Sequence, residues 1–118
     1  MKIGISLSGG GAKGIAHIGV LQALLDHDIE PHIISGASAG AIVGALYAAG
    51  IPASDMLHAI RNTSYLRILG FQWPDRGLGD MSYLKQLLAK LIKTDSFKSL
   101  HKPLYVSVMN LNSGLVEI

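Results

Sequence analysis

Short apolar runs alternate with stretches of helical periodicity along the first fifty residues. Lys2 to Ser8 is rich in Ile and Leu and ends in glycines, which predicts a buried strand, and His32 to Ser35 predicts a second one. Apolar side chains recur at helical spacing from Ala12 to His27, and a second helical stretch runs from Ala39 to Ala49. This alternation predicts a parallel sheet with helices packed on its faces. We therefore expect an α/β fold of three layers, α/β/α, with a mostly parallel sheet.

The middle of the chain predicts one further helix and then an irregular stretch. Ser54 or Asp55 is a suitable cap for a helix that reaches about Asn62. Thr63 to Gly79 carries a Trp-Pro pair, an aspartate and three glycines, and we expect no regular element there.

The remaining residues predict a helix and two strands. Asp80 or Ser82 caps the helix, and Leu104 to Leu111 and Leu115 to Ile118 are strands separated by the turn residues Asn-Ser-Gly. The helix carries an apolar stripe made of Leu84, Leu87, Leu88, Leu91 and Ile92. We expect this stripe to pack into the core. A helix that faces a membrane is the alternative, because lysines flank the apolar side.

The composition allows one domain and excludes several functional classes. The 118 residues are 49% hydrophobic, which suits a folded domain with a modest core. Lys and Arg are scattered and the formal net charge is only +2, so nothing indicates nucleic-acid binding. The absence of cysteine excludes disulfides, zinc–thiolate sites and thiol catalysis. The sequence shows neither a signal-peptide layout nor an apolar stretch of membrane-spanning length, so we expect a cytoplasmic protein.

Two glycine-rich turns, each after a predicted strand and before a predicted helix, carry the candidate chemistry. Residues 36–40 form a G-x-S-x-G, the pattern of a serine on a strained strand-to-helix elbow. Residues 9–14 form a row of glycines whose backbone N–H groups can hold an anion at a helix N-terminus. A nucleophile beside an anion hole is the main part of an acyl-transfer site. We expect the amides of Gly10 and Gly11, with that of Ala39, to receive the negative charge that forms when Ser38 attacks an ester.

Each turn also has a simpler interpretation. The first fits the dinucleotide fingerprint, but that function needs an acidic residue at the end of the second strand, and Asp26 and Asp28 come too early. A phosphate-binding P-loop needs Ser or Thr after its lysine, where this chain has Gly14. In the second turn, small residues around Ser38 are also typical of a tight turn whose hydroxyl caps the following helix.

Together the two turns resemble the amino-terminal signature of the patatin-like phospholipase family, a G-x-G-x-x-G loop followed shortly by a G-x-S-x-G. The run from Gly14 to Leu21 is similar to the first helix of that family. Pro103 to Gly114 resembles a later strand and turn, with Asn110 where many members have Asp. The similarity covers essentially the whole chain. It implies a patatin-like α/β fold. It also implies a protein that hydrolyses acyl esters of lipids, in contact with a membrane surface and without a metal or cofactor.

The resemblance also implies roles for individual residues. Ser38 is then the nucleophile, and Lys13 matches the basic position of the first loop. The oxyanion hole is the loop that contains Gly9, Gly10, Gly11, Lys13 and Gly14. The nucleophile elbow consists of Gly36, Ala37, Ala39 and Gly40 around the serine.

One part of the family's site is missing from the sequence. Members use a Ser–Asp dyad whose aspartate lies in an Asp-Gly-Gly or Asp-Gly-Ala motif, and neither motif occurs here; Asp75 and Asp80 fit neither version. We therefore expect residues 1–118 to be the amino-terminal portion of a single catalytic domain, with its base beyond Ile118. Since a parallel sheet without its later strands has an unpaired edge, we also expect self-association through that edge. A member that binds lipid or protein without turnover is the alternative function, and a nucleotide-binding α/β domain is a second one.

No other side chain is an evident base for the serine. The histidines are His17, His27, His32, His58 and His101, and none has an acidic residue at a sequence spacing that indicates a catalytic pair. We expect His17 to be a packed or surface histidine of the first helix. The aspartates are typical of caps and solvated turns. Contact with an anionic substrate is a simpler role for Lys13 than proton removal.

Overall fold

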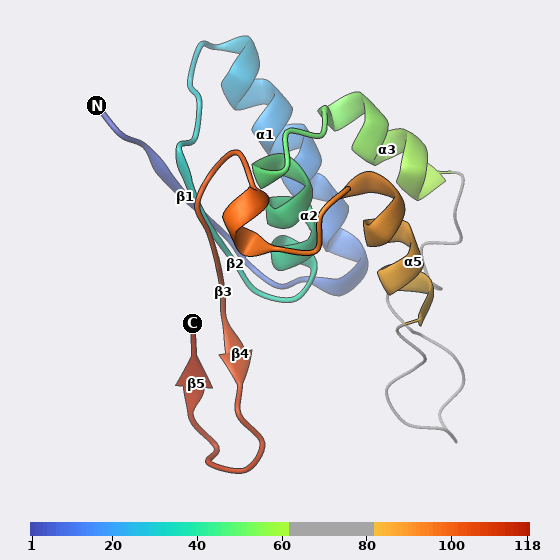
Figure 1. Ribbon diagram of the computed structural model, residues 1–118. Coiled ribbons are helices and arrows are strands. Elements are labelled where there is room, and N and C mark those ends of the chain that lie inside the picture. The colour runs from blue at the N-terminus through green and yellow to red at the C-terminus, as the bar shows by residue number, and fades with distance from the viewer. Residues whose placement is uncertain (62–81) are drawn as a thin grey trace.

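Three short parallel strands form the sheet on which the site is built. The computed structural model describes residues 1–61 and 82–118. Strands β1 (Gly4–Leu7), β2 (Ile33–Gly36) and β3 (Leu104–Val106) pair in the order β1-β2-β3 (Figure 1). Leu7 lies opposite Gly36, and Gly36 lies opposite Val106. The carboxyl ends of the three strands therefore meet at one edge of the sheet.

The helices lie close to their predicted positions, but the predicted caps Ser54, Asp55 and Ser82 lie inside helices that begin at or before them, and the first helix is divided. Helices α2 (Ala39–Ala48), α3 (Ala53–Arg61) and α5 (Ser82–Leu91) follow the apolar spacing of the sequence. The first predicted helix is divided into a 3-10 helix, η1 (Gly11–Ile15), and helix α1 (Ala16–Asp26). Glycines disfavour α-helix, and 3-10 turns are common at helix N-termini, which explains the tighter first turn.

A second 3-10 turn, η3 (Phe97–Ser99), precedes β3. The irregular stretch predicted over Thr63 to Gly79 and the cap predicted at Asp80 lie outside the described residues.

The helices lie on one side of the sheet (Figure 1). Parallel strands join through right-handed crossovers, and because the order β1-β2-β3 never reverses, successive crossovers pass over the same face. That face presents the buried Leu7 and Ile34, whereas Ile33 and Tyr105 on the opposite face are 39% and 52% exposed. The α/β fold with a parallel sheet is thus confirmed. Of the two predicted helical layers, residues 1–61 and 82–118 show the one that covers this face.

Helix α2 is the centre of the core and contacts all three strands of the sheet. Around it pack the fully buried Ile18 and Leu21 of α1 and Met56 of α3. Leu84 of α5 is also buried, and Leu88, Leu91 and Ile92 pack against the same cluster. The leucine stripe therefore belongs to the core, as the sequence predicted. Among the described helices, none is both long enough and apolar enough to cross a bilayer.

The strand predicted over Leu104 to Leu111 changes partner at Ser107. The amide of Ser107 donates a last hydrogen bond of 3.0 Å to the carbonyl of Gly36 in β2. Beyond it, β4 (Val108–Met109) pairs antiparallel with β5 (Val116–Glu117) in a hairpin that extends away from the helices (Figure 1). The sequence does not reveal this change, because both kinds of pairing have the same alternation of side chains.

Asn110 organises the turn of that hairpin. Its Oδ1 accepts hydrogen bonds from the amides of Asn112 (3.0 Å) and Ser113 (3.3 Å), and its Nδ2 donates to Glu117 at 2.8 Å. An aspartate could accept the first two bonds but could not donate the third. Asparagine therefore suits this position in the chain.

A polar cluster fastens the carboxyl end of α2 to the segments before β2 and β3. The hydroxyl of Tyr47 donates to the carbonyl of Pro31 at 3.3 Å, and the Nζ of Lys102 lies 5.6 Å from the centre of the Tyr47 ring. The same Nζ is 2.5 Å from the carboxylate of Glu30. This hydrogen bond and the charge of Lys102 hold the pKa of Glu30 below its usual 4.5, and burial raises the pKa of Tyr47.

Two glycines in helices offer a matched test of the packing between α2 and the sheet. A Cβ on Gly44 of α2 would lie 2.9 Å from Cγ2 of the buried Ile34, whereas a Cβ on Gly19 of α1 would meet nothing within 4 Å. Overpacking of the core outweighs the gain in helix propensity at residue 44, so we expect Gly44→Ala to lower the free energy of unfolding by about 1–2 kcal/mol. Gly19→Ala should raise it by roughly 0.5–1 kcal/mol, since only helix propensity changes. Urea denaturation measures both, and changes of the same sign would contradict the described packing.

Candidate active site

The two glycine-rich turns lie against each other at the carboxyl ends of β1 and β2. The amide of Ala37 donates to the carbonyl of Leu7 at 3.1 Å, which joins the second turn to the end of the first strand. A Cβ on Gly9 would lie 3.4 Å from Cβ of Ser38, so the first loop passes directly beside the serine. The parallel register thus brings together residues that are about thirty positions apart in the sequence.

Ser38 lies at the sharpest point of the turn from β2 into α2. Its backbone has φ 51° and ψ −124°, a combination that L residues rarely adopt and that costs of order 1–3 kcal/mol. The residue is exposed, and its side chain makes no capping hydrogen bond to the helix. Instead, its carbonyl accepts hydrogen bonds from the amides of Ala41 (2.9 Å) and Ile42 (3.2 Å). The hydroxyl is therefore free of the structural role that the simpler interpretation gave it.

Glycines allow this turn because their neighbours leave no room for a side chain. A Cβ on Gly36 would lie 2.7 Å from the amide nitrogen of Ala41, and one on Gly40 would overlap the carbonyl of Leu7. On the other side of the site, a Cβ on Gly14 would overlap that of Ala39. The start of α2 is thus in direct backbone contact with the end of β1 and with η1.

Several backbone amides around Ser38 lack partners. Within residues 1–61 and 82–118, the amides of Gly9 and Gly10 donate no hydrogen bond, and that of Ala39 belongs to the first turn of α2, where amides have no partner in the helix. The amide of Lys13 differs, because it donates to the carbonyl of Gly10 at 3.0 Å. The N-terminus of the ten-residue helix α2 adds a positive dipole end at Ser38. These groups are suited to an anion.

The described residues provide no side-chain partner for the Ser38 hydroxyl. Of the histidines considered as bases, His17 instead donates from Nε2 to the carbonyl of Ser8 at 2.9 Å, and His32 accepts a long bond of 3.4 Å from the amide of Ile3. Asp26 accepts a hydrogen bond from Gln22 at 2.7 Å on the surface of α1. Sequence reasoning missed the bond of His17 because it placed the helix start at Ala12, one turn too early. In the described ranges no three His, Cys, Asp or Glu side chains are grouped as a metal site.

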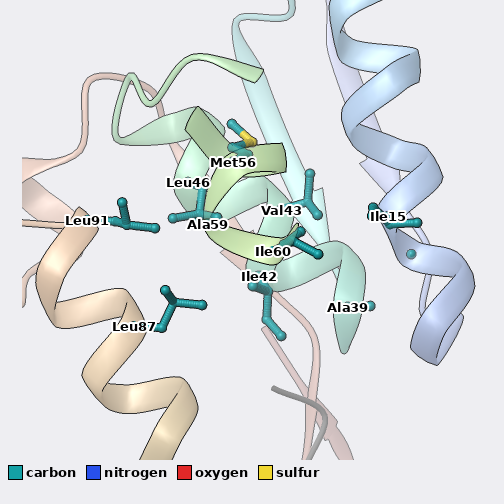
Figure 2. A pocket seen from close by; sticks show the side chains of 11 residues that line it. Ile15, Ala39, Ile42, Val43, Leu46, Met56, Ala59, Ile60, Leu87 and Leu91 are labelled. Carbon is teal, nitrogen blue, oxygen red and sulfur yellow. The ribbon is translucent and has the colours of Figure 1, made fainter. Parts of the chain in front are cut away.

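A small apolar cavity adjoins the elbow. Gly14 and Ala39 line it from the side of Ser38, and Ile42 and Leu46 of α2 face Leu87 and Leu91 of α5 across it (Figure 2). Its volume of about 20 Å³ is that of a single water molecule, and a cavity lined by carbon atoms stays dry. The apolar interior therefore extends as far as Ala39, the residue after the serine.

The fold and the site describe an α/β protein with a serine on a strand-to-helix elbow, next to a glycine-rich loop in which the amides of Gly9 and Gly10 have no partner among the described residues. The end of β2 carries this elbow where a dinucleotide-binding fold would need an acidic residue. The sequence model of the patatin-like phospholipases matches residues 5–114. The chain belongs to the patatin-like phospholipase family.

Curated relatives agree with this assignment. The chain is 40% identical over 81 residues to the patatin-like phospholipase domain-containing protein ZK370.4 of Caenorhabditis elegans, which covers 69% of this chain and 6% of that protein. It is 43% identical over 83 residues to the lysophospholipase NTE1 of Cryptococcus neoformans var. neoformans, strain JEC21, covering 70% and 5%. Over 47 residues it is 56% identical to the lysophospholipase NTE1 of Coccidioides immitis, covering 40% and 3%. The chain thus spans about one twentieth of the length of these relatives.

The strain at Ser38 gives a prediction that is independent of catalysis. Ser38→Gly and Ser38→Ala both remove the hydroxyl, but only glycine adopts the positive φ without a steric cost. We expect the free energy of unfolding of the glycine variant to be about 1 kcal/mol higher than that of the alanine variant. Thermal and urea unfolding of the pair measure this difference. Equal stabilities would show that the backbone of residue 38 is not strained.

Proposed function

We propose that the protein is a serine acyl hydrolase that acts on lipid esters, of the phospholipase or lysophospholipase kind. The observation that carries the proposal is the exposed Ser38, held at φ 51° beside the amides of Gly9 and Gly10, which have no partner among the described residues. Membership of the patatin-like phospholipase family and similarity to proteins named lysophospholipases support the choice of lipid esters.

In the proposed reaction the Oγ of Ser38 bonds to the ester carbonyl carbon while a base takes the hydroxyl proton. The carbonyl oxygen becomes an oxyanion, which accepts hydrogen bonds from the amides of Gly9 and Gly10 and from that of Ala39. Gly9 replaces Gly11 in the set expected from the sequence, because a Cβ on Gly9 would lie 3.4 Å from Cβ of Ser38. Collapse of this intermediate breaks the bond to the alcohol, which leaves with the proton. Water then attacks the acyl-enzyme in the same way, and the fatty acid is released. The steps use no metal or cofactor.

We propose that the base is an aspartate of the Asp-Gly-Gly or Asp-Gly-Ala motif, which these 118 residues do not contain. Two observations support a base from elsewhere. The Ser38 hydroxyl has no partner among the described side chains, and the nearby His17 already donates to a backbone carbonyl. The same observations favour the second candidate function, a protein that binds an acyl lipid without turning it over.

Labelling by a fluorophosphonate separates these functions, because the probe reacts only with an activated serine. We expect the protein that continues to the aspartate motif to be labelled and to hydrolyse a short-chain p-nitrophenyl ester, with both activities lost in Ser38→Ala. Residues 1–118 alone should react far more slowly, since a serine without its base is a weak nucleophile. Ser54→Ala, which changes an exposed serine of α3, is the control and should keep both activities. Labelling that persists in Ser38→Ala would contradict the proposal, and acyl-lipid binding with neither activity would favour the second function.

We also propose that the protein binds its lipid substrate at a membrane surface.

We further propose that residues 1–118 self-associate through a sheet edge. Among the described strands, β1 and β3 each have one neighbour, and their free edges can pair with a second copy. Sedimentation velocity should show dimers or larger species whose share rises with concentration. A single monomeric species over a hundredfold range of concentration would contradict self-association.

A further inference from the structure

His17 joins helix α1 to the loop beside Ser38 through a side-chain hydrogen bond. It is the second residue of α1, it is half-buried, and its Nε2 lies 2.9 Å from the carbonyl oxygen of Ser8. Since a carbonyl only accepts, the imidazole is the donor, and both the neutral ring with its proton on Nε2 and the charged ring can provide it. The bond thus ties the loop to a helix that is anchored in the core.

The carbonyl of Ser8 and the amide of Gly9 belong to one peptide group. Among the described residues no peptide bond is cis, and in a trans peptide the C=O and N–H are coplanar and point in opposite directions. Fixing the carbonyl of Ser8 toward His17 therefore fixes the direction of the Gly9 N–H. Gly9 is the residue whose Cβ position lies 3.4 Å from Cβ of Ser38.

The start of α2 also approaches the Ser8 carbonyl closely. A Cβ on Gly40 would lie 2.5 Å from its oxygen, so the backbone of α2 leaves little space beside this carbonyl. The loop itself provides little rigidity, because four of its six residues are glycines. The hydrogen bond from His17 and the close approach of Gly40 thus both restrict this peptide plane.

From this geometry we infer that His17 is a positioning residue, which orients the Gly9 amide toward the oxyanion through the carbonyl of Ser8. The inference rests on the proposed function and assigns to His17 a role other than that of a base. Losing one oxyanion donor outright typically lowers kcat by about 100- to 1,000-fold. Misdirecting a donor that stays in place should cost less, about 10-fold, because its amide still reaches the correct orientation part of the time.

Three substitutions separate the hydrogen bond from the packing of the ring. His17→Phe keeps a planar ring and removes the donor, His17→Gln keeps an N–H donor, and His17→Ala removes both. His27→Ala is the matched control, because His27 is exposed at the other end of the same helix. The test uses the protein that continues to the aspartate motif, and the rate measured is the second-order rate constant of Ser38 labelling by a fluorophosphonate.

We expect the Phe and Ala variants to be labelled about 10-fold more slowly than the unmodified protein, and the Gln variant to stay within about 3-fold of it. The control should match the unmodified protein. In ¹H–¹⁵N spectra, the amide signal of Gly9 should shift or broaden in the Phe variant and return in the Gln variant, and this second measurement does not depend on catalysis. A merely structural role of His17 would lower the melting temperature without rescue by Gln.

The outcomes distinguish this inference from the proposed function. Equal labelling of the unmodified protein and His17→Phe, or an unchanged Gly9 signal in that variant, would overturn the role of His17 and leave the function intact. If the unmodified protein is not labelled at all, the proposed function is wrong. The catalytic role inferred for the hydrogen bond between His17 and Ser8 is then wrong as well.

Discussion

The backbone contact between the start of α2 and the end of β1 is the constraint on which the rest of the structure depends. Gly40 lies so close to the carbonyls of Leu7 and Ser8 that no side chain fits between them, and the amide of Ala37 closes the contact with a hydrogen bond of 3.1 Å to Leu7. A helix that approaches a strand end this closely must leave β2 through a very tight turn. That turn places residue 38 in a conformation that only surrounding contacts can maintain. The exposed hydroxyl is a consequence of this packing.

The same contact explains why two loops from different parts of the chain form one site. In a parallel sheet the strands end at the same edge, and the register sets Leu7 opposite Gly36. The loop that follows β1 then has only one course, past the serine and into η1. Because glycines there leave the amides accessible, the proposed anion-binding surface consists of main chain. Its dipoles are fixed by the backbone, whereas the proposed proton transfer needs a side chain that the described residues do not place beside Ser38.

Much of this architecture could be predicted from the sequence, and the limits have physical reasons. The apolar runs and the helical spacing located the strands, α2, α3 and α5. This was possible because the spacing of apolar residues can be recognised from neighbouring positions in the sequence. The change of partner at Ser107 could not be predicted, because parallel and antiparallel strands have the same alternation of side chains. The described helices lie over one face because of the strand order, which local periodicity does not encode. At the candidate site, the G-x-S-x-G indicated the elbow at Ser38. The bond between His17 and Ser8 could not be predicted, because it depends on where a 3-10 turn gives way to an α-helix.

The positive φ of Ser38 has a further consequence for where the fold opens locally. A backbone conformation that is rare in an isolated chain exists only while residues 7–9 and 36–40 remain in contact, and the energy stored in it favours opening at that point. We therefore expect the elbow to open in brief local fluctuations while the buried core around α2 is still intact. Such opening is reversible as long as the core that restores the contact is not disturbed.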